Sequence, residues 1–291
     1  MAYHFQDVEI PTIHGRPLTG SVIDTPDSGT AVVIHPATAV SQGLYRAFAE
    51  HLADRGHSVL IYDYSGCGDS AAPGDDRRKD IRMTTWMFDD IPSVNHYARQ
   101  RWDGQRLLAV GHSIGSHGQI AVQQESPVEA LAMVASHAGI SALIPDLKER
   151  ARVWVFFNAI IPVTARMTGR VPVQEIGMGK PIPVGALTQW AKWSRRRHYF
   201  FDDQEFDFTG RYAAANFPVQ STCFADDLWA TREATSVLTD RMASADITEQ
   251  DVTPAPGDKL GHMDFFRSRN EKYWHLVSDW LGTPDASYPP S

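Results

Sequence analysis

The feature of the sequence that most constrains the fold is an apolar run, 107–110, that leads into the motif Gly-His-Ser-Ile-Gly at 111–115. A helix-compatible stretch follows the motif. The two glycines remove side chains where a buried strand would turn sharply into a helix. Such a turn holds Ser113 in a strained conformation and exposes its hydroxyl at the edge of a sheet. The pattern predicts a nucleophilic serine, and it predicts that the Ile114 N–H at the helix start donates to an oxyanion.

The rest of the chain alternates between buried strands and helices. Apolar runs typical of parallel strands occupy 31–35, 58–63, 107–111, 130–136 and 219–224. Helical patterns occupy 41–55, 84–101, 114–125, 231–243 and 271–281, with a weak strand at 247–252. The segments 3–10 and 18–24 are typical of an N-terminal hairpin. This order predicts an α/β fold with a mostly parallel central sheet flanked by helices.

The alternation stops after residue 136 and resumes near residue 219. Between these points, 147–161 and 187–197 have helical patterns. We expect prolines to divide the remainder into turns, at Pro162, Pro172, Pro181 and Pro183. The sequence therefore predicts a core domain formed by 1–139 and 213–291, and an inserted helical cap subdomain formed by 140–212.

A nucleophilic serine needs a base, and the base needs a carboxylate that orients it. His262 lies in a loop between the last predicted strand and the last predicted helix, where it could reach the end of the sheet. The acid should follow the strand 219–224, and two candidates, Asp226 and Asp227, stand there side by side. We favour Asp227 because of its position in the loop, while Asp226 could cap the following turn. The choice between them stays open at this point.

A second oxyanion donor should come from the loop that follows the strand 31–35. Pro36 has no N–H to donate, so the sequence favours the backbone of Ala37, with Thr38 as its neighbour or as a side-chain donor. A loop that serves only packing is the alternative. Substrate-binding candidates near these groups are Thr38, His112, Trp154, Phe157 and Trp190, although those in the cap could equally form its core.

Composition narrows the classes of partner. The chain has 27 Lys and Arg against 35 Asp and Glu and lacks the clustered basic residues of a nucleic-acid-binding protein. Two cysteines, and a start without a basic and apolar signal pattern, favour a cytoplasmic protein with free thiols. The apolar stretch 153–163 is too short to span a membrane. No His, Cys and carboxylate cluster has metal-ligand spacing, so we expect neither a metal nor an organic cofactor.

The motifs resemble those of the α/β-hydrolase superfamily over nearly the whole chain. The resemblance rests on 111–115, on the turn 63–70 and on Gly261-His262. The chain is most similar to a bacterial group of predicted hydrolases with a helical cap, which is related in outline to monoacylglycerol lipases and serine aminopeptidases. Ser65 departs from the pattern, because many relatives have arginine in this turn, and the departure implies a missing ion pair near the sheet edge.

The resemblance implies a triad of Ser113, Asp227 and His262, and the order of these residues along the chain agrees with it. We therefore predict hydrolysis of a small-molecule carboxylic ester, with an apolar acyl or aromatic group, through an acyl-enzyme. Acyl transfer and carbon–carbon bond hydrolysis can use the same triad. A non-catalytic ligand-binding protein of this fold is the alternative from another class. The sequence leaves the oligomeric state open.

Overall fold

The computed structural model describes residues 3–175, 177 and 179–283, and an eight-stranded sheet forms its centre. The strands are β1 (Gln6–Ile10), β2 (Leu18–Ile23), β3 (Thr30–His35), β4 (Ser58–Tyr62), β5 (Arg106–His112), β6 (Ala130–Val134), β7 (Pro218–Phe224) and β8 (Asp246–Val252). Their spatial order is β1-β2-β4-β3-β5-β6-β7-β8. Only β2 runs antiparallel to its neighbours, β1 and β4, and all other pairs are parallel. This order confirms the predicted α/β-hydrolase fold.

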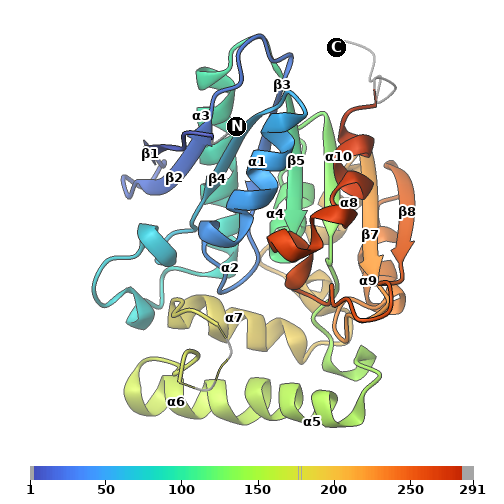
Figure 1. Cartoon of the computed structure of the whole chain (residues 1–291). Coiled ribbons are helices and arrows are strands. Elements are labelled where there is room, and N and C mark those ends of the chain that lie inside the picture. The colour runs from blue at the N-terminus through green and yellow to red at the C-terminus, as the bar shows by residue number, and fades with distance from the viewer. Residues whose placement is uncertain (1–2, 176, 178, 284–291) are drawn as a thin grey trace.

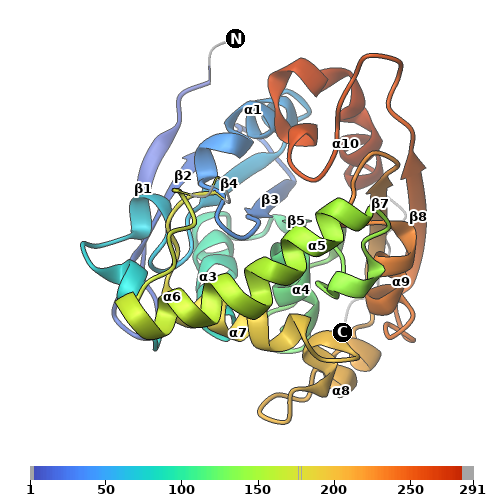
Figure 2. The same cartoon turned by 90° about the horizontal axis from the view of Figure 1, so that it is seen from below.

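Helices cover both faces of the sheet (Figures 1 and 2). On one face lie α1 (Arg46–Asp54) and α10 (His275–Leu281), and on the other lie α3 (Ile91–Arg101) and α4 (Ile114–Ala121), with α2 (Met83–Thr85) leading into α3 and α9 (Arg232–Thr239) following β7. Along β3, Val32 and Ile34 pack toward α1, whereas Val33 packs toward α3. Because both faces are covered, the central strands read as continuous apolar runs.

The segment between β6 and β7 is helical. It contains α5 (Leu147–Val155), α6 (Ile161–Thr168), α7 (Val184–Ser194) and α8 (Phe208–Ala214). Figure 1 shows α5, α6 and α7 together beyond the ends of the parallel strands. The loops after these strands therefore face the inserted helices, which is where ligands bind in α/β proteins. The exact division of the chain into core and cap at 140–212 stays a prediction.

Pro162 does not end the helix, contrary to the sequence prediction. A π-helical turn, Phe156–Ile160, joins α5 to α6, and the helix continues to Thr168. A wider turn relieves the clash that proline makes with the preceding turn, and proline lacks the N–H that the turn would otherwise use. The helix stops at Gly169, which has a φ of 72°. The second predicted helix is also displaced: α7 begins directly after Pro183 and ends before Arg195.

Helices α5 and α6 expose several large hydrophobic side chains. Five large hydrophobic side chains are 44–77% exposed there: Leu147, Trp154, Val155, Val163 and Met167. The inner face contributes Val153, Phe156, Phe157 and Ile161 to the core. Neither helix has the length and hydropathy needed to cross a membrane, and this holds for every helix in the described ranges.

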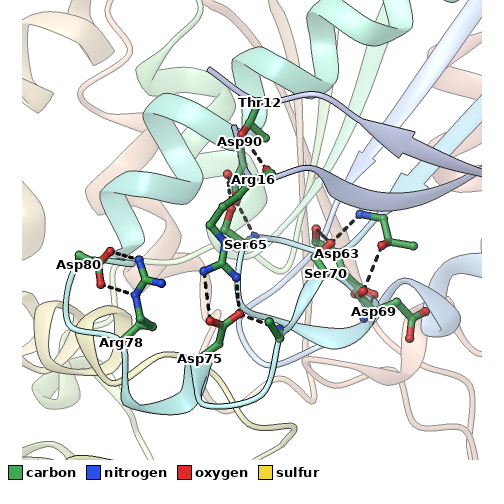
Figure 3. A network of polar contacts seen from close by, with 12 residues as sticks. Thr12, Arg16, Asp63, Ser65, Asp69, Ser70, Asp75, Arg78, Asp80 and Asp90 are labelled. Carbon is green, nitrogen blue, oxygen red and sulfur yellow. Dashed lines mark hydrogen bonds and ion pairs between the residues drawn. The ribbon is translucent and has the colours of Figure 1, made fainter. Parts of the chain in front are cut away.

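The chain turns sharply after β4, and Asp63 stabilises the turn (Figure 3). The Asp63 carboxylate accepts hydrogen bonds from the backbone N–H groups of Gln42 and Asp69, both at 2.9 Å. The backbone carbonyl of Asp63 accepts one from the Ser70 hydroxyl at 2.7 Å. Gly68 has a φ of 49°, and a Cβ there would overlap the Asp63 carboxylate. Close packing thus accounts for the glycine in this turn.

Ser65, in the same turn, hydrogen-bonds Asp90 (Figure 3). The Ser65 N–H and hydroxyl donate to the two Asp90 carboxylate oxygens at 2.7 and 2.8 Å. The nearby Arg16 pairs with Asp75 instead. Asp90 is 1% exposed, and its burial raises the pKa of the carboxyl to about 7. Two hydrogen bonds to Asp90 therefore hold Ser65 in this turn.

We expect Asp90→Asn to stabilise the protein at alkaline pH. The carboxyl has a pKa of about 7 in the folded protein and an ordinary value of 3.8 in the unfolded chain, so ionisation costs the folded state stability as the pH rises. The amide can keep both hydrogen bonds because the Ser65 hydroxyl can donate or accept. Between pH 5 and pH 8 the free energy of unfolding of the variant should gain about 3 kcal/mol relative to wild type. Urea denaturation at both pH values measures this, and a pH-independent difference would contradict it.

Candidate active site

The turn between β5 and α4 holds Ser113 in a strained conformation. Its φ is 53° and its ψ is −115°, a region that side-chain-bearing residues rarely adopt. A Cβ at Gly111 would overlap Ser116, and a Cβ at Gly115 would overlap the carbonyl of His35. The two glycines of the motif therefore allow the helix to start directly against the ends of β3 and β5.

Asp227 and His262 form a hydrogen-bonded pair. The two residues follow β7 and β8, and His262 Nδ1 lies 2.8 Å from Asp227 Oδ2. The other carboxylate oxygen accepts the N–H groups of Trp229 at 2.8 Å and Ala230 at 3.0 Å. Burial opposes ionisation of Asp227, but the facing His262 and these hydrogen bonds outweigh it and lower the pKa to about 2. Asp227 is therefore an ionised, oriented acceptor for the imidazole.

Asp226 contacts the loop before His262 rather than its ring. Its carboxylate oxygens accept the backbone N–H groups of Leu260 and Gly261, both at 3.0 Å. The neighbouring Asp227 makes the turn contacts that the sequence suggested for Asp226. One aspartate thus orients the histidine ring, and the other holds the histidine loop.

A buried chain of hydrogen bonds connects the loop after β3 to the histidine loop. The Ala37 N–H donates to the Tyr45 hydroxyl at 2.9 Å, which lies 2.8 Å from His112 Nδ1. His112 Nε2 lies 2.7 Å from the carbonyl oxygen of His262 and must donate to it. Burial lowers the pKa of His112 to about 3, so the ring is neutral. Nδ1 therefore accepts a hydrogen bond from the Tyr45 hydroxyl.

These hydrogen bonds change two of the predictions made from the sequence. The Ala37 N–H donates to the Tyr45 hydroxyl, so it is already engaged and would have to leave this partner to donate to an oxyanion. His112 is fully buried and holds the His262 loop, so it makes no surface for a substrate. Sequence reasoning could not anticipate either result, because Tyr45 reaches both residues only in the folded structure.

A cavity of about 400 Å³ lies beside the turn that contains Ser113. Ser113, His262 and Thr38 lie on its wall. The apolar part of the wall includes Phe156, Val173, Ile182, Leu187, Trp190 and Trp229. Arg152 also borders the cavity and pairs with Glu149, which accepts the Trp229 indole N–H at 2.7 Å. The cavity wall is thus mostly apolar, and the Arg152 side chain on it already has a carboxylate partner.

The cap residues predicted to bind substrate have three different placements. Trp190 lines the cavity. Phe157 is buried and packs against the Trp190 ring, with 4.8 Å between ring centroids, so it supports the wall from behind. Trp154 is 56% exposed on the outer face of α5 and does not reach the cavity, because it lies on the opposite side of the helix from Val153 and Phe156.

Two residues of the cavity escaped sequence reasoning. His137 lies just after β6, and its ring centroid is 5.3 Å from that of His262. Trp229, two residues after Asp227, lies 6.0 Å from the His262 ring by centroids. The sequence signal that could have identified His137 is its position at the end of a buried parallel strand.

Within the described part of the chain, no three His, Cys, Asp or Glu side chains lie close enough together to hold a metal ion.

The strand order, with a serine in the turn after β5 and a histidine–aspartate pair after β7 and β8, defines an α/β-hydrolase. The chain belongs to the serine aminopeptidase S33 family, whose model matches residues 26–193, more than half of its length. Membership in this family places it among the serine hydrolases. No curated protein sequence matches the chain.

Solved structures of esterases and lipases have a similar fold. A monoacylglycerol lipase of Paleococcus ferrophilus is 19% identical, with a TM-score of 0.60 over 91% of this chain and 98% of that one. An esterase of Pyrococcus furiosus is 14% identical, with a TM-score of 0.61 over 96% and 92%. An esterase of Exiguobacterium antarcticum is 16% identical, with a TM-score of 0.59 over 96% and 100%. At these identities the similarity is one of fold.

Proposed function

We propose that this protein hydrolyses carboxylic esters that have an apolar acyl or aromatic group, with Ser113 as nucleophile. The observation that carries the proposal is the shared cavity of Ser113 and His262, together with the hydrogen bond from His262 Nδ1 to Asp227. A histidine held by a carboxylate in this way can take a proton from a serine hydroxyl. The arrangement supports hydrolysis through an acyl-enzyme.

In the proposed mechanism, Asp227 accepts a hydrogen bond from His262 Nδ1–H, so Nε2 carries the lone pair. Ser113 Oγ attacks the ester carbonyl while its proton passes to His262 Nε2, and Asp227 stabilises the resulting imidazolium. His262 then returns this proton to the leaving alcohol, and the acyl group stays on Ser113. A water molecule then attacks the acyl carbonyl while His262 takes one of its protons. The bond between Ser113 Oγ and the acyl group breaks, the acid leaves with the oxygen of the water, and His262 returns the proton to Ser113 Oγ.

Two donors are proposed for the oxyanion of the tetrahedral intermediate. Ile114 is the first residue of α4, and the first N–H groups of a helix have no partner within the helix. Thr38, on the cavity wall, is the second, through its N–H or its hydroxyl. Thr38 replaces Ala37 in the proposal because Tyr45 accepts the Ala37 N–H.

The cavity supports the proposed substrate class. Its apolar wall, including Phe156, Ile182 and Trp190, can bury an acyl chain or an aromatic ring. About half of the lining residues come from the segment 140–212, and we propose that this segment acts as a cap that shapes the substrate pocket. Burial of the ester between the cap and the turn at Ser113 would also reduce the water around the reacting carbonyl.

Covalent labelling tests the proposal. A fluorophosphonate should add once to the wild-type chain and not at all to Ser113→Ala, as read by intact mass. Ser244→Ala is the matched control, because Ser244 is exposed and donates only to the Ala213 carbonyl, and it should label like wild type. Equal labelling of Ser113→Ala would refute the assignment. No labelling of any form would favour a ligand-binding protein.

A further inference from the structure

His137 is held rigidly beside the proposed nucleophile. The segment around it is anchored to α9, because the Thr235 hydroxyl donates to the Ser136 carbonyl at 2.8 Å and the Ala138 N–H donates to the Ala234 carbonyl at 2.9 Å. The His137 ring packs edge-on against His262 and Trp229, at centroid distances of 5.3 and 6.0 Å. These contacts give the ring a defined place on the cavity wall.

The hydrogen bond of His137 determines its tautomer. Nδ1 lies 3.0 Å from the Ala138 carbonyl oxygen, which can only accept, so Nδ1 carries the proton. Burial lowers the pKa of His137 to about 4, and the ring is therefore neutral near pH 7. Nε2 then has a lone pair and no proton. At this position the protein presents a hydrogen-bond acceptor.

The described residues supply no partner for this acceptor. None of the hydrogen bonds among the described residues involves His137 Nε2. This nitrogen is also absent from the polar atoms that are fully buried without a partner, although the residue is only 6% exposed. Nε2 therefore keeps some accessible surface, and His137 lines both the cavity that contains Ser113 and His262 and a small neighbouring cavity that shares Trp190 and Trp229 with it.

We propose that His137 forms a subsite for a hydrogen-bond donor on the substrate, a hydroxyl or N–H group close to the scissile carbonyl. The proposal rests on the proposed ester hydrolysis. It narrows the substrate class to esters that are mostly apolar and carry one donor near the reacting bond. An apolar group placed against Nε2 would leave a buried acceptor unpaired, and that penalty makes such a site selective.

The donor can belong to the acyl group or to the alcohol, and matched esters distinguish the two. For the acyl side, kcat/KM is compared between 4-nitrophenyl 3-hydroxybutyrate and 4-nitrophenyl butyrate. For the alcohol side, it is compared between 2-hydroxyethyl butyrate and ethyl butyrate. In one of the pairs, wild type should prefer the hydroxylated ester by about 10-fold or more.

Variants connect the preference to His137. His137→Phe keeps a ring without an acceptor, and the ratio within the preferred pair should fall to about one. His137→Gln offers a side-chain carbonyl and should retain part of the preference. Phe156→Leu, a matched change on the apolar wall, should alter kcat/KM for both esters of a pair by a similar factor.

Each outcome has a definite meaning. Ser113-dependent hydrolysis without a preference in either pair overturns the subsite and leaves the proposed function intact. A preference that persists in His137→Phe also overturns the subsite alone. Hydrolysis that continues unchanged in Ser113→Ala, or no hydrolysis of any ester, overturns the proposed function and the subsite together. Because the first comparison uses wild type, it does not depend on how the variants fold.

Discussion

Ser113→Ala should lower kcat for an apolar ester by about 10⁶-fold, because it removes the only atom that can form the acyl-enzyme in the proposed mechanism. The change deletes one oxygen and leaves the helix start and the cavity in place. We expect KM to change little, since the apolar wall that would bind the ester is unaffected. The measurement is steady-state hydrolysis of 4-nitrophenyl butyrate at high enzyme concentration.

Folding must be checked, because Ser113 has a strained backbone and alanine must adopt the same φ of 53°. Thermal unfolding of the variant should fall within a few degrees of wild type. Ser244→Ala should retain wild-type turnover, as an exposed serine with a single backbone contact. Turnover in Ser113→Ala within 10-fold of wild type would exclude the serine as nucleophile.

Asp227→Asn should lower kcat by about 10⁴-fold. Asparagine has the shape of aspartate, but it cannot stabilise the imidazolium, and its amide N–H can turn the histidine to the wrong tautomer. The carboxyl has a pKa of about 2, so wild-type Asp227 stays ionised across the neutral range and should not itself limit activity there. Steady-state kinetics from pH 6 to 9 measure the fall in kcat of the variant and the pH dependence of the wild-type activity.

Asp226→Asn is the matched control, since the same change is made one residue away. Asp226 accepts two backbone N–H groups in the loop before His262, and an amide oxygen can still accept one of them. Loss of one such bond should cost at most about 10²-fold in kcat. If Asp226→Asn were the more damaging change, the proposed roles of the two aspartates would have to be exchanged.

Most of the sheet could be predicted because its strands are buried on both faces. Runs such as 31–35 and 107–111 are short and rich in apolar residues, as strands of a sheet covered on both faces are. The inserted segment was harder to predict. A proline such as Pro162 normally ends a helix, and the π-helical turn directly before α6 lets the helix continue through it.

The proposed triad could be anticipated because each member lies near the end of a different strand, and the ends of parallel strands meet at one edge. The residues that line the cavity could not be predicted equally well. Trp154 and Phe157 are three residues apart on one helix, yet the first points to solvent and the second into the core. Which side of the helix faces the cavity depends on how α5 packs against the core.

The sequence by itself determined the elements whose signals are local. The glycines at 111 and 115 require a tight strand-to-helix turn, and the apolar runs require a covered sheet. Tertiary structure alone decided the direction of individual side chains and N–H groups. It turned Asp227 rather than Asp226 toward His262, directed the Ala37 N–H to Tyr45, and placed His137 on the wall of the cavity that contains Ser113. Hydrogen bonds act over about 3 Å, so residues distant in sequence must first be brought together before their partners are defined.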